Sequence, residues 1–351
     1  MKAFKTSSKQ WSYFVGIDIS KDELDIALLK DDTFLFHQEY KNETKDIAQA
    51  IKILKQIPGF KIAKAIFCME DTGIYNNHLV EFLVKIKASI VVENGLRIKR
   101  TLGMVRGKSD KTDAIRIAEY ASRFRGDLVL LSAKRPVLQQ LSDLLSLRSK
   151  LVVMSDALGV RLKEQSGFKK KALHEASVVL CKDSVQALKG DIAKVERSID
   201  RLFKADESLN RMHGLITSIP GVGMITATQI IVSTNEFKNF SSAKKFACYA
   251  GVAPFLNESG KSIGKARISK MANQKIKRLL HLCAMTAITR DGEIKAYYQR
   301  KVEGEGKSKM SVLNAVRNKL VLRIFACVKA NRPFEKNYVR AVVDNDLQQV
   351  Y

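Results

Sequence analysis

The most restrictive feature of this sequence is its middle segment, 137–204, where apolar residues recur at the alternating 4/3 spacing of a coiled coil. The first series is interrupted by Arg148 and Ser155, the second is uninterrupted, and a basic joint at 167–172 separates them. The spacing predicts two long helices that either fold back antiparallel or intertwine with another subunit. The apolar positions are Val137, Leu141, Leu144, Leu151, Leu158 and Leu162, followed by Val185, Leu188, Ile192, Val195, Ile199 and Leu202.

The residues before this segment alternate between short apolar runs and amphipathic stretches, which is typical of an α/β domain. Two short runs closely follow the first one, with tight turns between them, and this predicts an antiparallel three-stranded start. The predicted strands are 13–19, 23–30, 33–38, 62–69 and 88–92, and the predicted helices are 44–57 and 75–87.

Four carboxylates stand out in this first part. Asp18 interrupts one apolar strand and Glu70 ends another, and a charge in such a run is costly without a partner. Asp110 and Asp113 are three residues apart at a predicted helix start, so they share one face of its first turn. Together the four are suited to one or two Mg²⁺ ions, which prefer oxygen ligands. The alternative is two solvated helix-capping acids and two acids at strand ends.

The last third offers two features that suit a phosphodiester partner. Residues 219–223 (IPGVG) before a helix match the pattern of helix-hairpin-helix DNA binders, although a plain Pro-Gly turn explains the same letters. Residues 259–278 place three serines among seven lysines and arginines, with no acid before Asp291. We interpret this stretch as a basic loop leading into a helix at 272–289, followed by one or two basic helices within 294–330.

Composition narrows the class of binding partner. The 351 residues carry a formal charge of +25, which indicates a polyanion, with nucleic acid favoured over a membrane surface. No apolar run is long enough to span a bilayer, and the N-terminus lacks the apolar core of a signal peptide. Five widely spaced cysteines indicate a reducing, cytoplasmic setting without a zinc site.

In combination these features make the chain resemble the IS110/IS116/IS902 family of transposases, also called DEDD transposases, over nearly its whole length. The individual matches are modest, and it is their order and spacing that is specific. One departure is Ala272 before Asn273, where many relatives have Gly-Asn. The matching segments are 16–20 (GIDIS), 70–73 (EDTG), 108–114 (KSDKTDA), 219–223 (IPGVG), 250–254 (AGVAP), 259–260 (SG) and 268–270 (ISK).

The resemblance implies a RuvC-like, ribonuclease H fold at the N-terminus, whose acidic tetrad Asp18, Glu70, Asp110 and Asp113 binds Mg²⁺. It implies that Ser259 attacks DNA and forms a covalent phosphoserine link. It also implies bacterial dimers or tetramers in which the tetrad of one subunit meets the serine of another, and in some members a bridge RNA that pairs with donor and target DNA. Choosing Ser259 over Ser262 and Ser269 rests on this resemblance.

The expected fold class is therefore α/β plus mostly α, with domains at 1–130 (RuvC-like), 131–208 (coiled-coil helices), 209–335 (C-terminal transposase domain with a helix-hairpin-helix-like element) and a tail at 336–351. One alternative is a metal-dependent nuclease without a covalent intermediate, similar to a Holliday-junction resolvase. Another is a non-catalytic nucleic-acid binder. The residues expected to contact nucleic acid are Lys108, Lys111, Gly221, Gly223, Lys261, Lys265, Arg267, Lys270, Lys275, Lys277 and Arg278.

Overall fold

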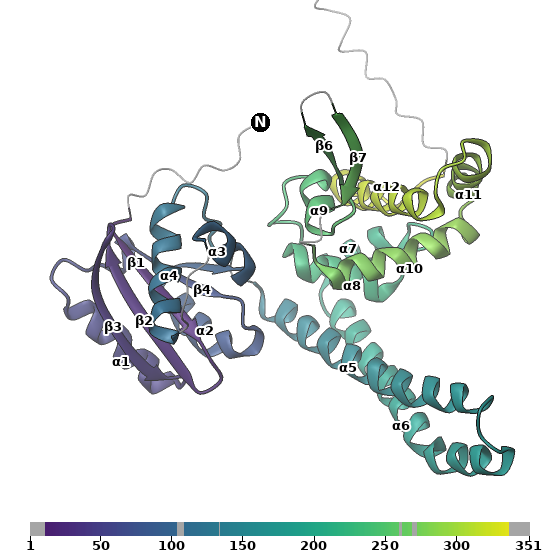
Figure 1. The fold of residues 1–351 in the computed structure, drawn as a ribbon, viewed down its shortest axis with the longest axis horizontal. Helices are drawn as coiled ribbons and strands as arrows, with labels where there is room; N and C mark the ends of the chain where they lie inside the picture. Colours follow the sequence, from purple (N-terminus) through teal and green to yellow (C-terminus); the bar gives the residue numbers. More distant parts are fainter. Residues whose placement is uncertain (1–10, 104–108, 133, 260–261, 269–271, 337–351) are drawn as a thin grey trace, which may run out of the picture. The chain divides into compact units, whose positions relative to one another are not determined.

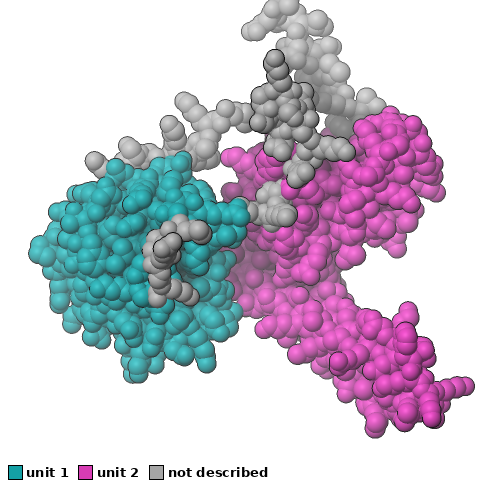
Figure 2. All heavy atoms as spheres, in the orientation of Figure 1, with its two compact units in different colours: residues 1–133 teal, residues 134–351 magenta. Residues whose placement is uncertain are grey.

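The computed structural model describes residues 11–103, 109–132, 134–259, 262–268 and 272–336. The chain divides into two compact units, 1–133 and 134–351 (Figure 2). Unit 1 is a mixed α/β layer structure, and unit 2 is almost entirely helical (Figure 1).

Unit 1 is built on a five-stranded sheet of order β3-β2-β1-β4-β5 (Figure 1). The first three strands form an antiparallel meander, and β4 pairs parallel with both β1 and β5. This arrangement confirms the antiparallel three-stranded start that the sequence predicts. The strands are β1 Tyr13–Ile19, β2 Glu23–Lys30, β3 Thr33–Lys41, β4 Ala65–Glu70 and β5 Ser89–Glu93.

Helices cover both faces of this sheet. One face packs on the apolar sides of α1 and α2, through residues such as Ile51 and Leu83. The opposite face packs on α4, through Ile117 and Ala121, and on Ile98 of α3. The central strands are thus buried on both sides, as the long apolar runs of β1 and β4 predict, whereas the edge strand β3 is mostly exposed. The helices are α1 Thr44–Gln56, α2 Asn77–Lys85, α3 Gly95–Thr101 and α4 Asp110–Arg123, with short 3₁₀ turns η1 Ile62–Lys64 and η2 Gly73–Asn76.

Unit 2 begins with two long helices, α5 Pro136–Gln165 and α6 Lys171–Lys204, which lie side by side as a hairpin (Figure 1). Arg148, which interrupts the apolar series of α5, reaches across to Glu196 of α6 at 2.7 Å. Ile199 is buried at the base of the hairpin, whereas the positions nearer the tip are only half-buried. The two predicted helices are confirmed, and a coiled coil with another subunit stays a prediction.

The remainder of unit 2 is a helical body with one small hairpin of strands. Its helices share one core, which also includes the bases of α5 and α6. The elements are α7 Glu207–Thr217, α8 Met224–Thr234, α9 Ala243–Tyr249, β6 Pro254–Ser259, β7 Ser262–Ile268, α10 Gln274–Arg290, α11 Gly292–Gln299, the π-helical turn η3 Arg300–Gly304 and α12 Lys309–Ala330.

Several element boundaries differ from the sequence prediction. The predicted strand at 62–69 begins only at Ala65, because residues 62–64 form a 3₁₀ turn, and the predicted helix at 75–87 likewise starts as a 3₁₀ turn. The largest difference is in the basic stretch after residue 259, where the sequence predicts a loop and the structure contains strand β7. Pairing with β6 provides hydrogen-bond partners for the backbone of β7. Local composition does not reveal such pairing between strands.

Candidate active site and nucleic-acid interface

Asp18 lies on the face of the sheet that α4 covers. Successive side chains of a strand point to opposite faces, so Ile17 and Ile19 enter the core under α1 and α2 while Phe14, Gly16 and Asp18 face α4. Asp18 is the penultimate residue of β1, near the point where the apolar layer ends. An acid is therefore tolerated at this position in an otherwise buried strand.

The strand register places further carboxylates in line with Asp18. Asp25 of β2 stands directly opposite Asp18, and Glu39 of β3 opposite Asp25. On the other side Glu70 follows Met69, the partner of Ile17, and pairs with Glu93 of β5. Paired residues point to the same face, so each of the five strands contributes one carboxylate to a row across the sheet.

Helix α4 adds the remaining two predicted carboxylates. Its N-cap is Ser109, whose hydroxyl accepts the Thr112 N–H at 3.2 Å, so Asp110 and Asp113 lie in the first turn. The helix rests directly on β1 at Gly16, where a Cβ atom would overlap the backbone of α4. Gly16 thus sets the distance between Asp18 and the first turn of α4, a role the sequence did not indicate.

The four predicted tetrad residues repel one another. The pKa of Asp18 is raised to about 6, first by burial and then by the negative charges of Asp113, Glu70 and Asp110. The Glu70 carboxylate lies against Gly95 at the start of α3, where a Cβ would overlap it. Carboxylate oxygens that raise one another's cost of ionisation suit a hard divalent cation, whose charge would offset the effect on Asp18.

The side chains would have to adjust to bind that cation. Within the described part of the chain, no three carboxylate, imidazole or thiol groups stand at metal-binding separation. Asp18 accepts the backbone N–H of Ile19 at 3.1 Å. Rotation of the carboxylates toward a shared ion is therefore part of any metal-binding step.

Two other carboxylates of the row, Asp25 and Glu93, have donors. His37 Nε2 lies 2.8 Å from Asp25 Oδ1. Glu93 accepts from the Tyr120 hydroxyl at 2.9 Å and from Arg97 at 3.0 Å. Sequence reasoning missed Asp25 and Glu93, although the signals that identified Asp18 and Glu70, an acid in or at the end of an apolar strand, apply to both. These hydrogen-bond donors distinguish Asp25 and Glu93 from the four predicted tetrad residues.

In unit 2, the predicted glycine turn connects α7 to α8. Gly221 has a φ of +90°, and a Cβ there would overlap the backbone of α10 at Cys283 and Ala287. Close packing against α10 therefore accounts for a glycine at 221. Gly223 is the exposed N-cap residue of α8. Contact of this turn with nucleic acid stays a prediction.

Ser259 is the last residue of β6, and its cross-strand partner is Ser262 at the start of β7. Asn273 caps α10 by accepting the Ile276 N–H at 3.0 Å. Beyond the cap, burial and the charge of Arg278 lower the pKa of Lys275. Lys108, Lys261, Ser269 and Lys270 lie outside the described residues, as do the side chains of Ser259, Ser262, Lys265 and Arg267.

The other predicted contacts are distributed over both units. Lys111 is exposed on the first turn of α4, beside the tetrad residues. On α10, Lys277 is half-buried and Arg278 is exposed. Within the described residues, no helix is both long and apolar enough to cross a membrane.

Comparisons with known proteins agree with these features. A family model described as "Transposase", of the DEDD IS110 type, matches residues 15–165, and one described as "Transposase IS116/IS110/IS902 family" matches residues 213–299. The pilin gene-inverting protein of Moraxella bovis is 26% identical over 342 residues, which cover 92% of this chain and 98% of that protein.

Two further matches are partial. The transposase for insertion sequence element IS1111A of Coxiella burnetii is 26% identical over 198 residues, 49% of this chain and 53% of that protein. Among solved structures, T. thermophilus RuvC in complex with a Holliday junction substrate aligns with a TM-score of 0.28 and 12% identity, covering 34% of this chain and 99% of that chain.

Proposed function

This chain belongs to the IS110/IS116/IS902 family of transposases, and on that premise we propose that it cuts and rejoins DNA through a covalent phosphoserine intermediate. Asp18, Glu70, Asp110 and Asp113 hold a divalent ion, Mg²⁺, and Ser259 is the nucleophile. The observation that supports the proposal is the placement of Asp18 at the end of a buried strand, where burial and then the negative charges of Asp113, Glu70 and Asp110 raise its pKa to about 6.

The proposed reaction exchanges one phosphoester bond for another. The Ser259 oxygen attacks a backbone phosphorus, its proton is lost to solvent or a base, and a sugar oxygen leaves as a free hydroxyl. Attack by the hydroxyl of another strand reverses the step and releases the serine, so rejoining needs no ATP. The bound ion supplies charge neutralisation at the reacting phosphate. The chain's own tetrad residues would hold and orient that ion.

The second part of the proposal concerns how donor and target DNA sequences are selected. The chain carries a formal charge of +25, and its 61 lysines and arginines are distributed along the whole sequence, including the acid-free helices α10 and α12. Such a distribution suits backbone contacts better than base reading. We therefore propose that a bridge RNA selects donor and target DNA by base pairing.

The decisive experiment is a denaturing gel for a protein–DNA adduct. The chain is produced together with its native flanking DNA, purified, and mixed with supercoiled target plasmid and Mg²⁺. We expect an SDS-resistant adduct that is absent in EDTA, and absent when the protein is treated with RNase before the plasmid is added. Cut plasmid without any adduct would instead support the alternative, a RuvC-like metal-dependent endonuclease. An adduct that forms equally after RNase treatment would contradict the proposed role of a bridge RNA.

The third part of the proposal is that the chain acts as a homo-oligomer joined through the tip of the α5–α6 hairpin. Large apolar side chains are exposed there, with Phe168 94%, Leu180 82% and Val179 69% exposed. Exposed apolar patches of this kind mark interaction surfaces, and a second hairpin has a matching face.

Replacing Leu180 with Glu is expected to at least halve the mass of the assembly, measured by light scattering, because a charge cannot be buried in an apolar seam without a partner. The matched control is Val129→Glu, which changes an equally exposed apolar residue of unit 1 (74% exposed). A mass unaffected by Leu180→Glu, or lowered equally by Val129→Glu, would place the subunit interface elsewhere.

A further inference from the structure

Helices α10 and α12 pack against each other and are unusually one-sided in charge. Helix α10 contains four lysines and arginines, and helix α12 contains five, and neither contains an acidic residue. Most of these cations can reach water along their flexible stems. Arg317, near the middle of α12, cannot, since it is only 5% exposed.

The contacts of Arg317 provide no negative charge among the described residues. Its Nη2 donates to Nδ1 of His281 on α10 at 2.6 Å and lies 3.6 Å from the Met310 sulfur. A ring nitrogen that accepts this bond belongs to a neutral imidazole. The Arg317 Nε is buried with no partner in the described part of the chain. Burial lowers the pKa of this guanidinium.

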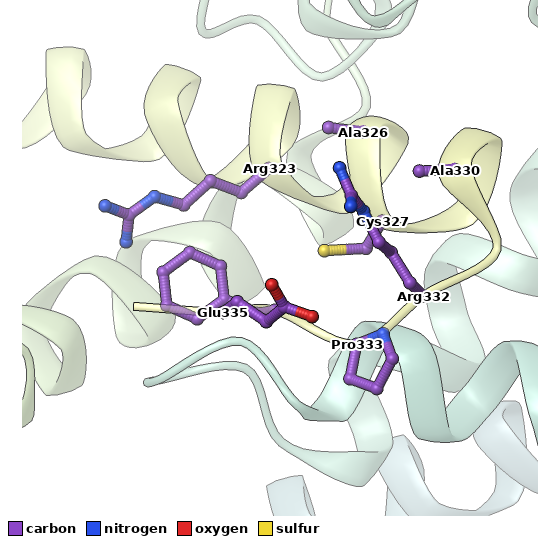
Figure 3. A pocket seen from close by; sticks show the side chains of 8 residues that line it. Arg323, Ala326, Cys327, Ala330, Arg332, Pro333 and Glu335 are labelled. Carbon is purple, nitrogen blue, oxygen red and sulfur yellow. The ribbon is translucent and has the colours of Figure 1, made fainter. Parts of the chain in front are cut away.

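Two other partly buried arginines in unit 2, Arg323 and Arg135, have acidic partners. Arg323, two turns further along α12, contacts Asp291 at 2.7 Å and Glu293 at 2.6 Å, and Figure 3 shows its side chain extended beside an aromatic ring, that of Phe334. Arg135 likewise pairs with Asp206 and Glu236. Because a buried charge without a counter-ion is strongly unfavourable, the unpaired state of Arg317 requires an explanation.

We propose that Arg317, together with His281 and Lys277, forms a binding site for one backbone phosphate of a nucleic acid. Lys277 is half-buried one helical turn before His281 on α10, so it lies along the same face. Arg317 keeps 5% of its surface exposed and its Nε has no partner among the described residues, so the guanidinium has donor capacity left for an anion. This inference deepens the proposed function, on which it rests.

A phosphodiester suits this site better than a carboxylate from a protein partner. A guanidinium presents a planar fork that matches phosphate oxygens, and charge-assisted bonds of this type strengthen where water is excluded. The nine cations of α10 and α12 also attract a polyanion along the whole helix pair. Because Arg317 is held by His281 and Met310, it is oriented before the phosphate arrives, which lowers the entropy lost on binding.

The test compares Arg317→Met with Lys329→Met, which removes an exposed cation from the last turn of the same helix. Binding of a short labelled DNA duplex and of a labelled RNA hairpin is measured by anisotropy between about 50 and 300 mM salt. For Arg317→Met we expect affinity to fall about ten- to a hundredfold. The slope of log K against log salt should decrease by about 0.9 for duplex DNA. The control should change affinity less than threefold.

The two nucleic acids assign the source of the phosphate. A change of slope with the duplex alone assigns DNA, and one with the hairpin alone assigns RNA. Thermal unfolding is recorded in parallel, because replacing an unpaired buried cation with methionine should leave the melting temperature unchanged or raise it. A lowered melting temperature with unchanged affinity and slope for both nucleic acids would show a structural role and overturn the proposal.

If Arg317→Met does not fold, Arg317→Gln is used, and the wild-type protein is titrated with pyrophosphate at constant ionic strength. Pyrophosphate should raise the wild-type melting temperature and not that of Arg317→Gln, and equal responses would overturn the site. If every variant, including Arg317→Met, shows the same steep dependence of affinity on salt, the proposed nucleic-acid function stands and this site is rejected. A flat wild-type titration would reject both.

Discussion

Asp18→Asn is expected to lower Mg²⁺-dependent DNA cleavage about a thousandfold, since it removes a ligand charge from the ion that neutralises the reacting phosphate. The substitution is nearly isosteric, so α4 should keep its place over Gly16. The measurement is the rate of nicking of supercoiled plasmid under single-turnover conditions. The matched control is Glu39→Gln, which removes an exposed carboxylate from the same row on the sheet but outside the tetrad. Cleavage by Asp18→Asn at the wild-type rate would contradict the metal assignment.

Although Asp18→Asn should lower cleavage, it should raise the free energy of unfolding at neutral pH. The folded-state pKa of Asp18, about 6, lies above the ordinary value near 3.9, so the fold favours the protonated carboxyl. The stability it contributes is present below about pH 4 and is lost as the pH rises through about 6. In EDTA at pH 7, Asp18→Asn should therefore be more stable than wild type by about 1–2 kcal/mol, after allowance for partial exposure.

Thermal unfolding at several pH values checks that sign. The advantage of Asp18→Asn should disappear below about pH 3, where the wild-type carboxyl is protonated in both the folded and the unfolded state. Adding Mg²⁺ at pH 7 should raise the wild-type melting temperature more than that of the variant, because only the wild type gains relief from carboxylate repulsion. A wild type that is more stable than Asp18→Asn in EDTA at pH 7 would show that Asp18 already has a favourable partner.

The sequence is sufficient to locate the two carboxylates at the ends of the apolar strands β1 and β4. Asp18 and Glu70 were identified because their flanks are apolar, and the sheet places them side by side at the end of parallel strands. It was not sufficient to identify the row of five, which depends on the register between β1, β2 and β3. Register is set by turn geometry and packing, and a shift of one residue would reverse the face of every side chain.

Glycines illustrate the same limit. Gly16 looks like an ordinary strand residue in the sequence, and only its contact with α4 explains why a side chain is excluded there. Gly221 was interpreted through a nucleic-acid motif, whereas in the structure its backbone packs on α10. In both cases the reason is close backbone approach, which is a tertiary contact between segments far apart in the sequence. Arg317 belongs with them, since nothing in the local sequence separates a buried arginine from an exposed one.

Ser259→Ala is expected to abolish the SDS-resistant adduct completely, because the alanine methyl group has no oxygen to bond to phosphorus. Cleaved plasmid should disappear with it if strand cutting proceeds only through the serine. Nearby hydroxyls make a matched control essential. Ser262 is the cross-strand partner of Ser259 at the end of the β6–β7 hairpin, so Ser262→Ala changes the same turn by the same atom. It should retain the adduct, as should Ser269→Ala.

Binding must be separated from chemistry in this comparison. A serine that only contacts phosphate loses one hydrogen bond on substitution, which weakens affinity by about three- to tenfold and is overcome by more protein. A nucleophile leaves affinity nearly unchanged and removes the product at any protein concentration. The adduct is therefore titrated with each variant to saturation, with Asp18→Asn as the metal-site reference. An adduct retained by Ser259→Ala and lost in Ser262→Ala would move the nucleophile across the hairpin, and cleavage without an adduct in every variant would leave hydrolysis at the tetrad as the reaction.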